Sequence, residues 1–157
     1  MRPHFGRRTV SQAANATAEI AAAGNFPHMH TYKVAAQTAP APQRSIHGGG
    51  WQVASSASVK IFSAACWFAG RDLQVALQDQ NTQVEAVPVA LVQASWGGTH
   101  IEAWSSSAAL AECPGVGTTV CHNPPPSADP QGHNNCSLLW NAMLVTLCPA
   151  AHPPAAS

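Results

Sequence analysis

The residues with the clearest chemical potential lie in the segment 93–99, which reads QASWGGT. Ser95 follows the apolar run VPVALVQ and is flanked by small residues, as in the nucleophile turns of many serine esterases. The Gly-x-Ser-x-Gly pattern of such turns is incomplete here, because Gln93 occupies the position of the first glycine. Among the histidines that follow, none of His100, His122 and His133 stands in a recognisable catalytic setting. Ser95 is therefore predicted to be structural, and a small α/β-hydrolase using Ser95 is the lowest-ranked alternative.

The two glycines after Ser95 have a better physical reason to take part in chemistry. Gly97 and Gly98 place backbone N–H groups after a strand, with no side chain to shield them, and a helix is expected soon afterwards. Such N–H groups can hold a developing oxyanion. A plain tight turn that needs a positive φ is the alternative, and the local sequence favours neither.

Five cysteines among 157 residues favour an oxidising compartment, with one or two disulfides and an odd thiol. Cys113 and Cys121 are the candidate pair, within an irregular, proline-rich loop over 112–135. A metal site is the weaker alternative, because the loop has no Cys-x-x-Cys pair and only one His-x-x-Cys spacing. Its ligand-type residues are Cys113, Cys121, His122, His133 and Cys136. No metal and no cofactor are expected.

Composition argues against several classes of partner. Charged residues make up only 9% of the chain, and the formal net charge is zero. No basic surface for nucleic acid or an anionic membrane is therefore expected. No apolar run is long enough for a transmembrane helix.

The N-terminus and two glycosylation motifs bear on the cellular location. The N-terminus, MRPHFGRRTVSQ, is basic but has no apolar core, so it does not read as a signal peptide. Two glycosylation acceptors, Asn15 and Asn135, stand in Asn-x-Ser/Thr motifs. Together with the cysteines, they favour the secretory pathway.

The elements that must position these residues form an α/β order. We expect a helix over 9–24, a short strand over 31–37 and a loop over 38–50. A clear helix over 59–77 has serine N-cap candidates before it, and the run 87–95 is typical of a parallel strand covered on both faces. The apolar face of that helix recurs at spacings of three and four: Val59, Phe62, Ala65, Cys66, Ala69, Leu73, Ala76 and Leu77.

Fewer elements are expected in the rest of the chain. Residues 100–113 are predicted to form a short helix, and residues 137–147 a buried helix that Ser137 could cap. Only two or three strands are visible, which is few for an α/β domain of this length.

Four segments together resemble the sialate O-acetylesterase family. VPVALVQASWGGTHIEAWSS is similar to the family's central block, in which a buried strand leads into Ser-Trp-Gly-Gly-Thr and then a Glu-Ala-Trp-Ser helix. WQVASSASVKIFSAACWFAGRDL resembles the preceding helix, and SLLWNAMLVTL the family's Leu-Trp-Asn-Ala-Met helix. VSQAANATAEIAAAGNFPHMHTYKVA resembles the segment just after the family's nucleophile. The resemblance covers 9–147, leaving 1–8 as a non-matching N-terminus and 148–157 as a disordered tail.

The resemblance implies a fold, a reaction and a site. The fold would be an incomplete three-layer α/β/α SGNH-hydrolase-like (flavodoxin-like) domain with a parallel sheet. The family removes O-acetyl groups from sialic acids through a serine acyl-enzyme, so an O-acetylated sugar is the implied partner, and a secreted or lysosomal location is implied. Gly97 or Gly98 would supply an oxyanion-hole N–H. The candidate substrate-pocket residues are Trp96, Thr99, Glu102 and Trp104.

The chain also departs from the family pattern. The family's nucleophile stands in a Gly-Gln-Ser-Asn-Met segment, and HFGRRTVSQ occupies that place here without such a serine. The family's histidine and its acidic partner lie further along than this sequence extends. We therefore predict a fragment of a sialate O-acetylesterase-like carbohydrate esterase without significant activity of its own. The alternative is a non-catalytic sugar- or partner-binding remnant that uses Trp96, Trp104 and the cysteine-rich loop.

Overall fold

The structure is a computed structural model that describes residues 8–80, 87–113, 129 and 132–148. The chain divides into two compact units. Unit 1 comprises Met1–Val34 and Gly48–Ser95, and unit 2 comprises Ala35–His47 and Trp96–Ser157. The boundary between the units therefore falls inside the QASWGGT segment, between Ser95 and Trp96.

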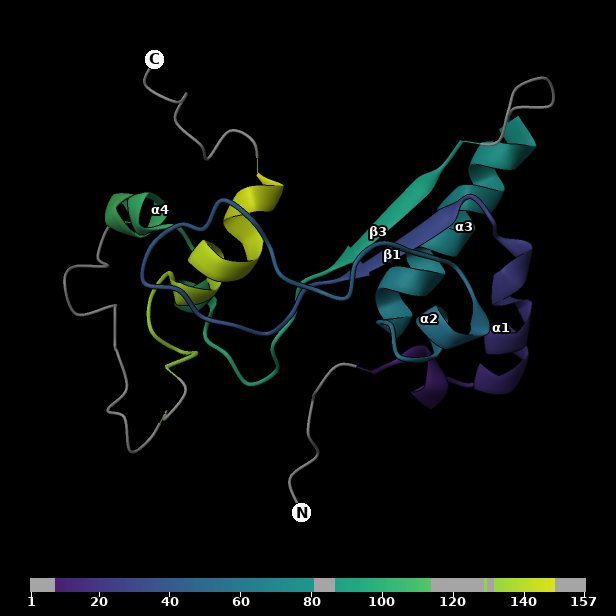
Figure 1. Ribbon diagram of the computed structural model, residues 1–157, viewed down its shortest axis with the longest axis horizontal. Helices are drawn as coiled ribbons and strands as arrows, with labels where there is room; N and C mark the ends of the chain where they lie inside the picture. The colour runs from purple at the N-terminus through teal and green to yellow at the C-terminus, as the bar shows by residue number, and fades with distance from the viewer. Residues whose placement is uncertain (1–7, 81–86, 114–128, 130–131, 149–157) are drawn as a thin grey trace. The chain divides into compact units, whose positions relative to one another are not determined.

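Unit 1 contains a three-stranded mixed sheet in the order β2-β1-β3. β1 (Met29–Lys33) pairs in parallel with β3 (Val89–Gln93) and antiparallel with the short β2 (Gln52–Val53). The parallel pair and its covering helices confirm the predicted α/β class (Figure 1). β1 begins two residues before the predicted strand over 31–37 and also ends earlier.

The helices of unit 1 are more broken than the sequence suggested. The helix expected over 9–24 consists of η1 (Val10–Gln12), α1 (Ala16–Ala22) and η2 (Ala23–Asn25). Asn15 separates η1 from α1, because its φ of 59° lies in the left-handed region.

The single helix predicted over 59–77 is wrong. The chain forms α2 (Ser56–Lys60), capped by the Ser55 side chain, and then a separate α3 (Ala64–Gln80). Between them, the Ser63 N–H donates to Gln93 Oε1 at 2.8 Å, and the Ala64 N–H donates to the Arg8 carbonyl at 2.9 Å. Bonds to distant segments thus replace the intrahelical bonds that would have continued α2.

The break changes which face of α3 is buried. Trp67 and Gln74 are fully buried, whereas Leu73, on the predicted buried face, is 51% exposed. Gly70 lies against the Leu91 side chain, because a Cβ there would come within 2.4 Å of it. The prediction failed because the helix restarts at Ala64 in a phase set by Trp67 and Gly70.

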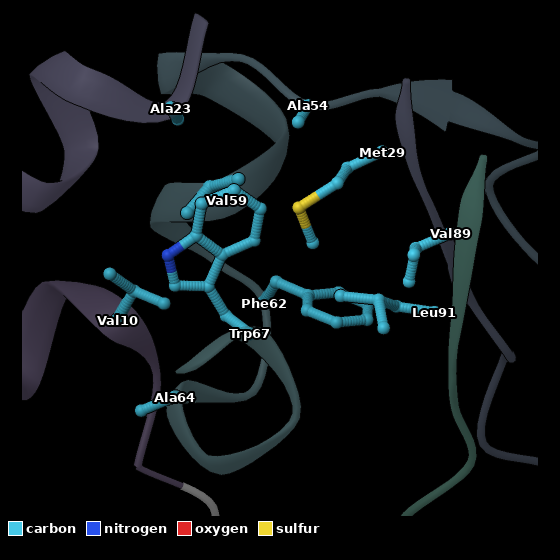
Figure 2. Packing of buried hydrophobic residues seen from close by; sticks show 10 residues of the cluster. All are labelled: Val10, Ala23, Met29, Ala54, Val59, Phe62, Ala64, Trp67, Val89 and Leu91. Atoms are coloured by element: carbon cyan, nitrogen blue, oxygen red, sulfur yellow. The ribbon is translucent and has the colours of Figure 1, made fainter. Parts of the chain in front are cut away.

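The core of unit 1 lies between these helices and one face of the sheet. In Figure 2 the Trp67 indole lies near Val10 and Val59. The core cluster is Val10, Ala23, Met29, Ala54, Val59, Phe62, Ala64, Trp67, Val89 and Leu91. Along β3 the residues Val89, Leu91 and Gln93 are buried but Ala90 is exposed. The predicted cover on both faces of this strand is therefore wrong for the described part of the chain.

Unit 2 consists of short helices and loops. The helix predicted over 100–113 is present as η3 (Ile101–Trp104) and α4 (Ser107–Glu112), and Ser106 caps α4. The segment predicted as a buried helix over 137–147 is helical, with the wide π turn η4 (Trp140–Leu144) followed by η5 (Val145–Leu147). Ser137 contributes its carbonyl, which accepts the Asn141 N–H at 2.8 Å. The buried apolar residues of these helices are Ala103, Leu139, Ala142, Met143 and Val145.

In the described ranges, none of the helices is both long and apolar enough to cross a membrane. The residues predicted as a non-matching N-terminus and as a disordered tail lie almost entirely outside those ranges, as does most of the predicted loop over 112–135.

Candidate functional site

Ser95 lies at the end of unit 1 and is half-buried. The Gln93 Nε2 donates to Ser95 Oγ at 3.1 Å, and Gln93 Oε1 accepts the Ser63 N–H. A serine nucleophile needs a base that accepts its proton. Within the part of the chain that the structure describes, no histidine hydrogen-bonds to Ser95. Gln93, which replaces the first glycine of the nucleophile turn, thus links Ser95 to the start of α3.

The glycine turn belongs to unit 2, where Thr99 closes it. The Thr99 Oγ1 donates to the Trp96 carbonyl at 2.7 Å, so the two glycines between them form a tight turn. Gly98 has a φ of +78°, and both Gly97 and Gly98 are exposed. Among the described residues neither glycine N–H has a hydrogen-bond acceptor. The turn therefore presents two backbone donors to whatever occupies the space beside it.

Trp104 braces the turn from η3. Its indole Nε1 donates to Thr99 Oγ1 at 2.8 Å, so Thr99 accepts from one tryptophan and donates to the carbonyl of the other. The structure thereby brings together three of the four predicted pocket residues, Trp96, Thr99 and Trp104. The fourth, Glu102, is half-buried on η3, and its carbonyl accepts the Ser137 N–H at 3.0 Å.

An acid–histidine pair beside this turn was missed from the sequence. The His133 ring stacks on the Trp96 indole, with centroids 5.1 Å apart and planes 13° apart. Its Nδ1 lies 2.8 Å from Oδ1 of Asp129, whose side chain is 1% exposed. Asp129 Oδ2 accepts the Asn134 N–H at 2.7 Å, and Asn134 in turn accepts the His100 N–H at 2.8 Å. The Asp-x-x-x-His spacing was the available signal, but it is weak, because four-residue spacings are common.

The cysteines do not pair as predicted. Cys136 is disulfide-bonded, whereas Cys113 is free and exposed, so the predicted pairing of Cys113 with Cys121 is wrong. Cys121 and His122 lie outside the described residues. A disulfide removes Cys136 from the set of thiolate metal ligands. The described residues contain no group of three or more His, Cys, Asp or Glu that could hold a metal ion.

The two glycosylation motifs have different surroundings. Asn15 is exposed in the connection before α1. Asn135 is half-buried, its Oδ1 is buried without a hydrogen-bond partner in the described structure, and Ser137 of its motif is 7% exposed. Asn15 is thus the more accessible acceptor.

The fold of the chain is similar to part of a solved carbohydrate esterase. A solved carbohydrate acetylesterase from Xanthomonas citri matches with a TM-score of 0.66 and 26% sequence identity. The match covers 90% of this chain but only 26% of that enzyme. No family model matches the chain.

Sequence relatives narrow the resemblance. The human and Pongo abelii sialate O-acetylesterases are each 41% identical to the chain over 91 residues, which cover 57% of this chain and 15% of each relative. The rat sialate O-acetylesterase is 32% identical over 112 residues, 67% of this chain and 19% of the relative. The chain thus spans less than a fifth of the length of these curated relatives. The predicted partial resemblance to the sialate O-acetylesterase family is confirmed.

Proposed function

We propose that the chain supplies the oxyanion-binding turn and part of the sugar pocket of an esterase that removes acetyl groups from sugars. The observation that carries the proposal is the pair of N–H groups at Gly97 and Gly98, which have no acceptor among the described residues, in a turn closed by Thr99 and braced by Trp104. Donors that are already oriented stabilise an oxyanion without reorganising as charge develops.

Aromatic side chains beside the turn suit a sugar substrate. Trp96 and Trp104 are both half-buried, so each keeps part of its indole surface available. An indole ring provides an apolar face for the C–H groups of a sugar ring. Glu102 is the proposed polar member of the same pocket, and the names of the sequence relatives favour an O-acetylated sialic acid as the substrate.

We propose a secreted or lysosomal location for the protein. The accessible motif at Asn15 and the disulfide at Cys136 are both compatible with the secretory pathway. Neither nucleic acid nor a membrane is a proposed partner, because the net charge of zero provides no attraction to either.

The test is binding of a sugar methylphosphonate monoester, whose tetrahedral anion resembles the intermediate of acetyl transfer, by isothermal titration calorimetry. Gly98→Ala should weaken binding at least tenfold, because a left-handed φ disfavours alanine and the turn must change. Gly50→Ala is the matched control, since Gly50 also has a positive φ, of 76°, and open space at its Cβ position, but lies in unit 1. It should bind like the wild type.

Ser95 provides a second control in the same experiment. Ser95→Ala should leave phosphonate binding unchanged, and hydrolysis of 4-nitrophenyl acetate by the chain should show no dependence on Ser95. Equal weakening by the Gly98 and Gly50 variants would remove the special role of the turn. Turnover that disappears with Ser95→Ala would overturn the assignment of chemistry to the glycines.

A further inference from the structure

We infer that His133, oriented by Asp129 and stacked on Trp96, is a subsite that forms a hydrogen bond with a neutral sugar hydroxyl next to the acetyl ester. The inference rests on the proposed function and specifies which part of the sugar this face of the pocket takes. All three residues belong to unit 2, as does the glycine turn.

Asp129 determines which nitrogen of His133 is available to a ligand. The carboxylate is almost fully buried, and a buried carboxylate requires partners. One of its oxygens accepts the Asn134 N–H, and the other faces His133 Nδ1 at 2.8 Å. Within the described ranges neither Asp129 Oδ1 nor His133 Nδ1 has a hydrogen-bond partner, so the 2.8 Å approach between them is a close polar contact rather than an aligned hydrogen bond. Because Nδ1 faces the buried carboxylate, Nε2 is the ring nitrogen that remains for a hydrogen bond to a ligand.

The remaining nitrogen is oriented and accessible. The His133 side chain is 22% exposed, and its Nε2 has no protein partner among the residues described. Stacking on Trp96 determines the plane of the ring, and Asp129 determines its rotation. Trp96 directly precedes Gly97, so this ring lies close to the proposed oxyanion donors. A side chain held in place in the free protein loses little entropy on binding.

Charge determines which ligand group suits this nitrogen. The Asp129 carboxylate behind the ring disfavours an anion there, whereas the hydroxyl group of a polyol carries no net charge. The sequence of unit 2 contains one arginine and no lysine, against three acidic residues: Arg44, Glu102, Glu112 and Asp129. A sugar carboxylate would find few cations in this unit, and the hydroxyl-bearing part of the sugar is the better occupant.

The test compares two forms of one ligand, 9-O-acetyl-N-acetylneuraminic acid and its carboxyl methyl ester, by calorimetry and by NMR of the histidine rings at pH 7.5. The methyl ester, which lacks the negative charge, should bind at least as tightly as the acid. Both should shift the ring signals of His133 in the wild-type protein, a readout that needs no substitution.

Substitutions then separate the hydrogen bond from the stack. His133→Phe retains a ring against Trp96 but removes both nitrogens, and it should lower affinity for both ligands at least fivefold. The double variant Asp129→Asn with His133→Phe avoids an unpaired buried charge and should show the same loss. His100→Phe is the matched control, since His100 is exposed in the same unit, and it should bind like the wild type.

Each outcome decides between the two proposals. Tighter binding of the acid than of the methyl ester by tenfold or more would overturn the neutral-hydroxyl assignment. Binding that persists in both His133 variants, without a shift of the His133 signals, would exclude the subsite while leaving the proposed function intact. Absence of binding by the phosphonate and by both sialic acid forms would overturn the proposed function, and the subsite with it.

Discussion

Glu19 connects α1 to α3, and its removal gives the sharpest test of how unit 1 is held together. One carboxylate oxygen accepts the Trp67 indole N–H at 2.7 Å, and the other lies 2.7 Å from Arg71 Nη1. Trp67 is fully buried, whereas the Arg71 side chain is 28% exposed and also pairs with Asp72 at 2.8 Å. These contacts raise the pKa of Arg71 above its ordinary value, with the Asp72 hydrogen bond as the largest cause.

The expected loss follows from which partner is left unsatisfied. Glu19→Ala leaves the buried Trp67 N–H without an acceptor, which costs about 1–3 kcal/mol. Loss of the partly exposed ion pair with Arg71 adds roughly 0.2–1 kcal/mol. The free energy of unfolding should therefore fall by about 1–4 kcal/mol in total. Glu19→Gln retains an oxygen for Trp67 and should lose only about 1 kcal/mol.

Urea unfolding followed by tryptophan fluorescence and circular dichroism measures both variants. Asp79→Ala is the control, because Asp79 is an exposed acid on α3, and its unfolding free energy should change by less than about 0.5 kcal/mol. A loss below about 0.5 kcal/mol for Glu19→Ala would refute the argument. Equal losses for the alanine and glutamine variants would also refute the argument, because the oxygen that glutamine retains for the Trp67 N–H would then contribute no stability.

Two further predictions concern close packing and thiol reactivity. Gly48→Ala should destabilise the protein by about 1–3 kcal/mol, because the added Cβ would clash with the Lys33 carbonyl oxygen. Gly49→Ala, which has nothing within 4 Å of its Cβ position, should be nearly neutral. Thermal unfolding measures both variants, and equal melting temperatures would contradict the prediction for Gly48. Burial raises the pKa of the Cys66 thiol above its ordinary value, so less of its thiolate forms at pH 8. Iodoacetamide should therefore modify the exposed Cys113 faster than Cys66, which peptide mass spectrometry can measure. Faster labelling of Cys66 would contradict this prediction.

The family resemblance and the α/β class could be read from the sequence because both depend on local patterns. A continuous apolar run predicts a buried strand, and the parallel β3 is present where it was expected. The motifs around Trp96 and Trp104 are short enough to be recognised without a structure. For the same reason, the loop over 38–50 and the helix after Ser137 were predicted correctly.

The phase and length of the helices could not be read in this way. Periodicity favoured one helix through Phe62, but the N–H groups of Ser63 and Ala64 bond to residues distant in the sequence. The buried face of α3 then depends on Gly70, which admits Leu91 from β3. Such contacts join residues that are distant in the sequence, so a local hydrophobic pattern cannot predict them.

In the candidate site, too, the sequence predicts the residue types but not the contacts between them. The residue types of the turn, its pair of glycines and its two tryptophans are all present in the printed sequence, and they were sufficient to propose an oxyanion site there. Tertiary structure alone decided that Thr99 closes the turn, that Trp104 braces it, and that His133 stacks on Trp96 with Asp129 behind it. Hydrogen bonds and ring stacking require side chains at specific distances and orientations. For the stack of His133 on Trp96, they are determined only when residues 37 positions apart in the sequence fold against each other.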